Sequence, residues 1–521
     1  MKASAHQDCI MPLLCFSRRS ALALLTTLPL ACEPQAQRPA PASPTPPATA
    51  SPAAPVARAN ALEPPPPGLS PNAPFPKIEH QRLENGLELR VVERHVHPIV
   101  ELRLVVRSGS ATDGEKPGLA AVAGELLKAG GVAGLSPQKL VQRADALGTD
   151  LSILTDRDST RIALNVTSGD LDAALELLSK VAFAPSFQAD EFQKLRAREI
   201  ERVKSSARGS AGWAASMLLY RELFDLPTGI HPYSRMDAMP NELAQLSLAD
   251  CKAWHKAQFV PSNAALVIAG DVTPQTAQAA ANKWFGAWKG GEAPAVSISQ
   301  PFAPQARNVY IADRPGSGQS QVLVGVLGAE LRSPDWVGLT LANQVLGGGV
   351  SSRLFIDVRE KRSLAYSTGA SLNEMETGPS ALVLSAGTQT PKTPDTVAAL
   401  LENLEKMAAR APEPSEVDTA ARFLADGFVF KLETVGSLAD LTAHLYARSL
   451  PDEYYDDLRA RWRTLTPAEV GNVAQRYYAK TPVIVVAGDG ATLGPLLAQF
   501  GPVSVLDPEN GFSLKRSYPK R

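Results

Sequence analysis

The chain has 521 residues, 44% of them hydrophobic and 20% charged, which is typical of a soluble globular protein too long for one ordinary domain. The formal net charge of −1 gives no sign of a nucleic-acid-binding surface. Of the four cysteines only Cys251 lies beyond residue 32, which argues against a disulfide framework and against thiolate zinc sites.

Residues 1–32 predict an export signal. Arg18-Arg19 precedes an apolar run, Ala21–Leu30, that is too short to span a bilayer as a mature helix. The run ends in LPLAC, which resembles a bacterial lipobox with a proline where leucine is usual, and SRR weakly resembles a twin-arginine signal. We therefore expect a periplasmic or outer-membrane lipoprotein anchored at Cys32, with a plain cleaved signal as the alternative.

Residues 33–76 are dominated by Pro, Ala, Ser and Thr. Such a segment cannot bury enough apolar surface to offset the entropy lost on ordering. We expect an extended, semi-rigid tether that holds a folded body away from a membrane surface.

Strand-like and helix-like segments alternate after the tether. Leu87–Glu93 and Val100–Val106 alternate imperfectly between apolar and polar residues, as half-buried strands do. Pro137–Leu147 and Asp190–Ser206 predict long helices. Strands that pair by hairpins beside long helices indicate α+β layers rather than a doubly wound sheet.

A helix–strand–turn pattern occurs twice. Leu246–Asp250 leads through an aromatic residue to the apolar strand Ala265–Asp271, and Leu465–Glu469 leads in the same way to Val483–Asp489. In both copies a Ser or Thr caps the helix, and the strand stops at Ala-Gly-Asp.

The spacing between the copies is constant. Ser247 and Thr466 lie 219 residues apart, and Gly270 and Gly488 lie 218 apart. We therefore divide the body into two similar halves, residues 77–295 and 300–515, each with a mixed or antiparallel sheet and helices packed on it.

Residues 107–131 read RSGSATDGEKPGLAAVAGELLKAGG. This segment resembles the signature region of the pitrilysin/insulinase zinc peptidases, which include the mitochondrial processing peptidase. In that family the helix carries His-x-x-Glu-His, whose two imidazoles bind zinc while the Glu acts as general base. The corresponding positions here are Ala121, Gly124 and Glu125, which we expect on the helix face opposite its apolar residues.

The resemblance also implies a third ligand, a Glu, on the helix over residues 187–206. Its position is Arg202, or Glu201 if the register slips by one, and an Arg cation would repel Zn²⁺. His95 and His97 form the only close histidine pair, and we interpret it as a loop feature. We therefore expect no metal in this chain.

Two further segments match the family in the first half. His231-Pro232-Tyr233 matches its His-Pro-Tyr turn, where we expect a structural role for His231. Phe259-x-Pro261-x-Asn263 matches its closing helix-to-strand segment.

The second half retains the most specific stretch of the family's C-terminal domain, GGGVSSRLF followed by VREKRSLAYS. We expect a glycine turn, a helix capped by Ser351 or Ser352, and a strand from Leu364. Phosphate binding by the glycines is disfavoured because the Gly-Lys-Ser/Thr signature is absent. The resemblance implies that Arg359 binds substrate carbonyl groups and that the Tyr366 hydroxyl stabilises the oxyanion. The alternative is that Arg359 pairs with a nearby acid and Tyr366 is a half-buried core residue.

The sequence therefore predicts a non-catalytic subunit of a two-component zinc peptidase, inactive alone. A heterodimeric partner with His-x-x-Glu-His would hold the zinc, and this chain would contribute Arg359 and Tyr366. A catalytically inert binding or scaffold protein is the first alternative. The second is a metallopeptidase with unorthodox ligands such as Glu125, Glu201 and a His.

Overall fold

The computed structural model describes residues 68, 73–224 and 231–521. The predicted export signal, Cys32 and most of the tether lie outside these residues. The described chain already packs at its start, because the backbone N–H of Phe75 donates to both Asp456 carboxylate oxygens at 3.1 and 3.0 Å. Arg459 Nη1 donates to the carbonyl of Ala73 at 2.5 Å. The end of the predicted tether is therefore bound to the body.

Two sheets contain all the strands of the described residues. The first, ordered β1-β2-β6-β3-β5-β4, contains β1 (Glu79–Arg82), β2 (Glu88–Glu93), β3 (Ile99–Val106), β4 (Ser152–Thr155), β5 (Thr160–Thr167) and β6 (Ala264–Gly270). The second, ordered β13-β12-β7-β11-β8-β10-β9, contains β7 (Val309–Asp313), β8 (Gln319–Glu330), β9 (Ala365–Asn373), β10 (Pro379–Gln389), β11 (Val483–Gly488), β12 (Val503–Asp507) and β13 (Ser513–Tyr518).

The two sheets share one five-stranded pattern. β6 pairs in parallel with β2 and antiparallel with β3, and β11 pairs in parallel with β7 and antiparallel with β8. Antiparallel strands β5 and β4 complete the first pattern, and β10 and β9 complete the second. The fold is therefore α+β with two homologous halves, as the repeated Ala-Gly-Asp strands predicted.

Helices follow the strands in the same order in each half. Those of the first half are α1 (Leu119–Ala129), α2 (Pro137–Ala146), α3 (Leu171–Phe183), α4 (Ala189–Gly209), α5 (Ala211–Leu223), α6 (Pro240–Gln245), α7 (Leu248–Gln258) and α8 (Pro274–Phe285). Those of the second half are α9 (Trp336–Gly347), α10 (Thr393–Ala409), α11 (Pro414–Ala425), α12 (Val435–Ala447), α13 (Tyr454–Thr464), α14 (Pro467–Tyr478) and α15 (Gly490–Leu497). The helix caps predicted at Ser247 and Thr466 are confirmed, and each belongs to a capping box with an N3 acid, Asp250 or Glu469.

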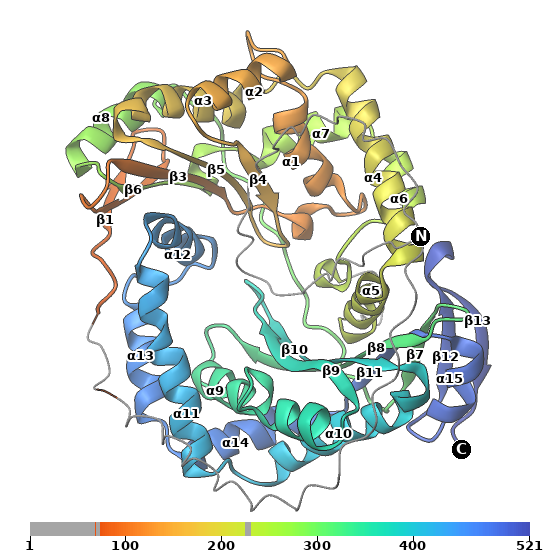
Figure 1. The fold of residues 1–521 in the computed structure, drawn as a ribbon. Coiled ribbons are helices and arrows are strands. Elements are labelled where there is room, and N and C mark those ends of the chain that lie inside the picture. The colour runs from red at the N-terminus through yellow and green to blue at the C-terminus, as the bar shows by residue number, and fades with distance from the viewer. Residues whose placement is uncertain (1–67, 69–72, 225–230) are drawn as a thin grey trace, which may run out of the picture. The chain divides into compact units, whose positions relative to one another are not determined.

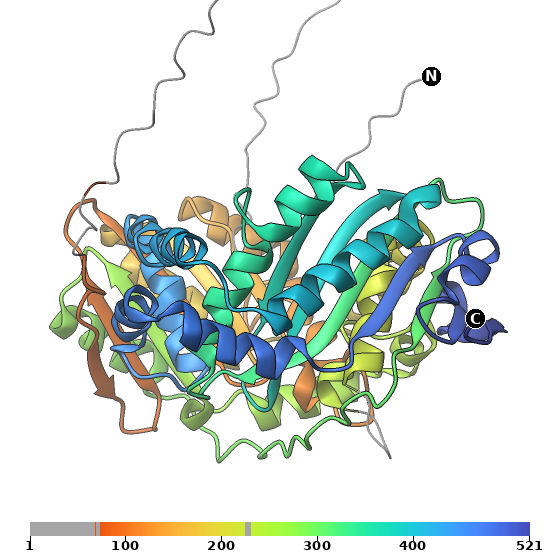
Figure 2. The same cartoon turned by 90° about the horizontal axis from the view of Figure 1, so that it is seen from below.

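Each half contributes one helix that packs against the sheet of the other half. Helix α5 packs against β8 and β11 of the second sheet, and α12 packs against β3 and β6 of the first (Figure 1). Figure 2 shows the blue helices of the second half beside the orange strands of the first. The α5 contact is apolar, with Leu219 packed against Gly325 of β8. The α12 contact is also apolar, since Val105 and Val267 of the first sheet share one hydrophobic cluster with Ala439 of this helix. It adds an ion pair, with 2.9 Å between Arg103 Nε and Asp440 Oδ1.

Candidate functional site

Helix α1 carries the positions that hold the metal in the resembled family. It begins after Gly118, whose φ of +83° is a left-handed conformation that favours glycine. The half-buried Asp113 carboxylate accepts hydrogen bonds from the backbone N–H groups of Gly118 and Ala120, both at 2.7 Å. The apolar face of the helix is buried as predicted, through Leu119, Val122, Ala123, Leu126 and Leu127.

The three degenerate positions do not share one environment. Ala121 and Glu125 are exposed, as predicted. Gly124 is buried, which corrects the expectation that it shares their exposed face. A Cβ at position 124 would lie 2.4 Å from Thr155 Oγ1 of strand β4. The β4–β5 hairpin therefore occupies the space that a side chain at position 124 would need.

The predicted third ligand position lies on α4 and is already paired. Arg202 Nε lies 2.6 Å from Glu199 Oε2, and Nη2 lies 2.9 Å from Asp237 Oδ2. Partial loss of hydration on this side of the helix and the nearby Glu199 carboxylate raise the pKa of Glu125. Glu201, the alternative in a shifted register, is exposed and accepts a bond from Lys204 at 2.7 Å. A guanidinium therefore occupies the third-ligand position, paired with Glu199 of this helix and with Asp237.

Zinc does not fit this set of side chains. The methyl group of Ala121 offers no electron pair to a metal, and Arg202 brings a positive charge. Gly124 has no carboxylate to act as general base. The unorthodox set of Glu125, Glu201 and a His is not brought together either. Across residues 73–224 and 231–521, no group of three or more His, Cys, Asp or Glu side chains is placed to hold a metal. His95 belongs to a turn and is bonded to Glu93 and Asp271, at 2.6 and 2.7 Å.

The glycine-rich signature of the second half leads into a π-helix, η5 (Phe355–Lys361). Ser352 accepts a weak hydrogen bond from the N–H of Phe355 at 3.5 Å, as expected of a capping serine. Arg353 forms a two-pronged pair with Glu416 of α11, at 2.8 and 2.7 Å. π-Helices are rare and occur frequently at functional sites. This one contains Arg359, one of the two residues that the sequence predicted to bind substrate.

Arg359 and Tyr366 lie side by side. The guanidinium carbon of Arg359 is 5.0 Å from the centre of the Tyr366 ring and 4.6 Å from that of Phe355. Tyr366, near the start of edge strand β9, is 73% exposed, which contradicts the alternative of a half-buried core residue. The acid pairing also considered for Arg359 is loose, with 3.6 Å between its Nε and Glu360 Oε1. The pair therefore presents donors at the surface of this half.

The His-Pro-Tyr turn helps to hold the halves together. Buried His231 accepts from the N–H of Tyr233 at 3.0 Å through Nδ1 and donates to the carbonyl of Ser299 at 2.9 Å through Nε2. This arrangement is that of a neutral ring, and burial lowers the pKa of His231. The Tyr233 hydroxyl donates to Asp158 at 2.6 Å and accepts from the backbone N–H of Thr377 in the second half at 3.4 Å. The geometry is that of a structural turn.

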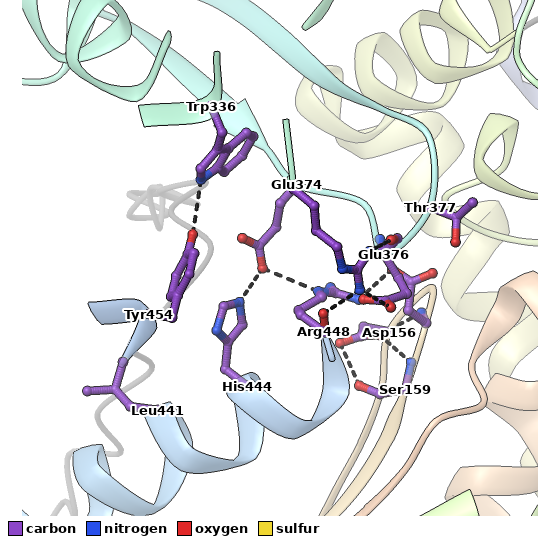
Figure 3. Close-up of polar contacts among 12 residues, drawn as sticks. Asp156, Ser159, Trp336, Glu374, Glu376, Thr377, Leu441, His444, Arg448 and Tyr454 are labelled. Carbon is purple, nitrogen blue, oxygen red and sulfur yellow. Dashed lines mark hydrogen bonds and ion pairs between the residues drawn. The ribbon is translucent and has the colours of Figure 1, made fainter. Parts of the chain in front are cut away.

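The sequence did not predict a partly buried ionic network between the two halves. Arg448, at the end of α12, lies 2.5 Å from Asp158 Oδ2 in the β4–β5 turn. It also donates through Nε to Glu374 at 3.3 Å, and Glu374 accepts a second bond from His444 (Figure 3). We name Asp158, Tyr233, Glu374, His444 and Arg448 the interhalf clamp.

The pKa values of the two carboxylates of the interhalf clamp are shifted in opposite directions. Burial raises the pKa of Asp158, whose side chain is only 5% exposed, despite its partner Arg448. Burial also acts to raise the pKa of Glu374, but His444 and Arg448 together outweigh it and hold this pKa at about 2. The difference arises because His444 and Arg448 both act to lower the pKa of Glu374, whose side chain is also more exposed than that of Asp158.

Within the described part of the chain, none of the helices is both long and apolar enough to cross a bilayer.

Both halves of the chain match models of the same protein family. Residues 90–218 match the model of the insulinase family, peptidase family M16, and residues 245–424 match the model of the peptidase M16 inactive domain. The zinc protease PqqE of Helicobacter pylori is 23% identical over 420 residues, covering 78% of this chain and 91% of that protein.

Solved structures agree with the fold. A peptidase M16 inactive domain from Pseudomonas fluorescens superposes with a TM-score of 0.74 and 26% identity, over 79% of this chain and 98% of that one. The periplasmic protease PqqL of Escherichia coli gives a TM-score of 0.67 at 15% identity, over 83% of this chain but 49% of its own. This chain therefore spans about half the length of PqqL.

Proposed function

Because this chain belongs to the insulinase family of M16 peptidases, we propose that it is the non-catalytic subunit of a two-component zinc peptidase. In this proposal a partner of the same family carries His-x-x-Glu-His and the zinc. This chain supplies Arg359 and Tyr366 to the peptide bound there. Neither subunit would hydrolyse peptides alone.

The observation that carries the proposal is the contrast between the two halves. The metal positions of the first half offer no ligand set and are partly filled by Thr155 and Arg202. Arg359 and Tyr366 of the second half remain together, with Tyr366 73% exposed. The match to only half of PqqL supports an assembly in which two such units act together.

The proposed roles follow from the chemistry of the two side chains. A planar guanidinium with several N–H donors suits peptide carbonyl oxygens. A phenol hydroxyl suits the oxyanion that forms when water attacks the scissile carbonyl, where each well-placed donor accelerates the reaction strongly. Both groups act on a substrate whose metal lies in the other subunit.

The test is reconstitution. The purified chain is mixed with a His-x-x-Glu-His relative from the same organism, and peptide hydrolysis and bound zinc are measured for each component and for the mixture. We expect activity only in the mixture, and a loss of about a hundredfold in kcat for Tyr366→Phe. Tyr518→Phe, at the opposite edge of the same sheet, is the matched control and should leave activity unchanged. Zinc-dependent hydrolysis by this chain alone would refute the proposal.

The same experiment addresses the inert scaffold. If the two proteins form a stable complex in which Tyr366→Phe changes nothing, the chain serves as a scaffold or binding protein.

We also propose that the complex is exported and anchored at Cys32, in agreement with the N-terminal sequence. Metabolic labelling with a radioactive fatty acid should mark the wild-type chain and leave Cys32→Ser unlabelled.

A further inference from the structure

The guanidinium of Arg359 contacts two aromatic rings rather than one. Phe355 lies four residues earlier on the same π-helix, with its ring centre 4.6 Å from the guanidinium carbon, and Tyr366 lies on β9 at 5.0 Å. Both distances are within the range of a favourable cation–π contact. Phe355 is half-buried, so its ring is the better fixed of the two.

A carboxylate competes for the same guanidinium. Glu360 is the next residue along the chain, and its Oε1 lies 3.6 Å from Arg359 Nε, longer than a good hydrogen bond. Its side chain is 59% exposed, so it has room to turn toward Arg359. An Arg359 that paired fully with Glu360 would have fewer N–H groups free for a substrate.

We propose that Phe355 is the positioning residue of this site and holds the guanidinium of Arg359 beside Tyr366 and away from Glu360. The ring keeps the guanidinium plane fixed, so that the N–H edge stays available to a planar acceptor such as a peptide carbonyl. The consequence for catalysis rests on the proposed function, whereas the placement of Arg359 does not.

The first test uses the isolated chain and needs no partner. Crystal structures are compared for wild type, Phe355→Leu and Phe355→Tyr. In Phe355→Leu, Arg359 should form a full ion pair with Glu360 and leave the Tyr366 ring, and in Phe355→Tyr it should stay in place. An Arg359 that remains over Tyr366 in Phe355→Leu would overturn the proposal. Circular dichroism checks that each variant folds, and Phe355→Tyr keeps the test valid if the leucine variant does not.

The second test uses the reconstituted peptidase. Phe355→Leu should raise KM about two- to fivefold, the equivalent of one lost cation–π contact, with little change in kcat. Phe355→Tyr should behave as wild type, and adding Glu360→Gln to Phe355→Leu should restore part of the affinity. Ile356→Ala, an exposed neighbour on the same π-helix, is the control. A fall in kcat alone, or no rescue by Glu360→Gln, would contradict a positioning role.

The two tests can refute the proposed function and the role of Phe355 independently of each other. If wild-type mixtures show no activity, the proposed function fails while the crystal structures still decide where Phe355 holds Arg359. If the mixtures are active and Phe355→Leu leaves both KM and the Arg359 position unchanged, only the role of Phe355 is refuted.

Discussion

Arg448 of α12 and Asp158 of the β4–β5 turn form an ion pair with 2.5 Å between Nη1 and Oδ2, although they lie 290 residues apart in the chain. The side chains are 10% and 5% exposed, so this pair is buried between the halves. Tyr233 and the backbone N–H of Glu376 donate further bonds to the same Asp158 carboxylate, at 2.6 and 3.1 Å. The contact therefore joins both halves through one carboxylate.

We predict that Arg448→Met lowers the free energy of unfolding by about 3–5 kcal/mol, because it leaves Asp158 buried without a cation. Adding Asp158→Asn should recover part of the loss, since the remaining group is then neutral. Urea unfolding measures both. The control is Arg208→Met, which breaks an exposed pair with Glu509 and should cost less than about 1 kcal/mol. Equal losses in the two single variants would contradict the role of burial.

Glu374 predicts a loss of stability in acid. Its pKa of about 2 in the folded chain lies below the value of 4.5 for a free glutamate. The folded state therefore binds fewer protons than the unfolded state between these values, and the free energy of unfolding falls as the pH drops from about 4.5 to about 2. Glu374→Gln removes this contribution. The stability difference between wild type and Glu374→Gln should shrink across that pH range, and a constant difference would show that the carboxylate charge is irrelevant.

Introducing the family's metal-site residues into this chain should not produce a zinc site unless Thr155 is also replaced. We predict that Ala121→His, Gly124→Glu, Glu125→His and Arg202→Glu together bind no stoichiometric zinc. A Glu side chain at position 124 would clash with Thr155 and displace the helix that carries the two introduced histidines. Elemental analysis of the purified variant measures this.

The companion variant adds Thr155→Ala to that graft. We expect it to gain zinc, since the methyl side chain of alanine leaves room for the glutamate introduced at position 124. Stoichiometric zinc in the graft that keeps Thr155 would mean that this threonine moves aside at little cost.

The cap of α1 can be tested directly. Asp113→Ala removes two hydrogen bonds to backbone N–H groups at the helix start, and we predict a loss of about 1–2 kcal/mol in the free energy of unfolding. Glu115→Ala changes an exposed acid in the same loop and should cost almost nothing. Thermal unfolding of the two variants side by side provides the comparison. A similar melting temperature for both would exclude the capping role.

Local sequence signals determined much of this protein. The Ser247 and Thr466 caps and the two Ala-Gly-Asp strands predicted a duplicated α+β body, because capping and β-branched apolar runs act over a few residues. The pairing of Arg359 with Tyr366 was also predicted from a short motif. The absence of zinc ligands at Ala121 and Arg202, and of a general base at Gly124, needed no structure, since side-chain chemistry alone decides it.

Only the tertiary structure revealed what surrounds those residues. That Gly124 is buried against Thr155, and that Arg448 reaches Asp158, depends on segments that lie far apart in the chain, the second of them on the exchanged helix α12. No periodicity or spacing encodes such contacts, because a buried charge is stabilised by partners distant in the chain. The sequence by itself decided which groups this chain carries, and packing within and between the halves decided which of them are held, covered or left free.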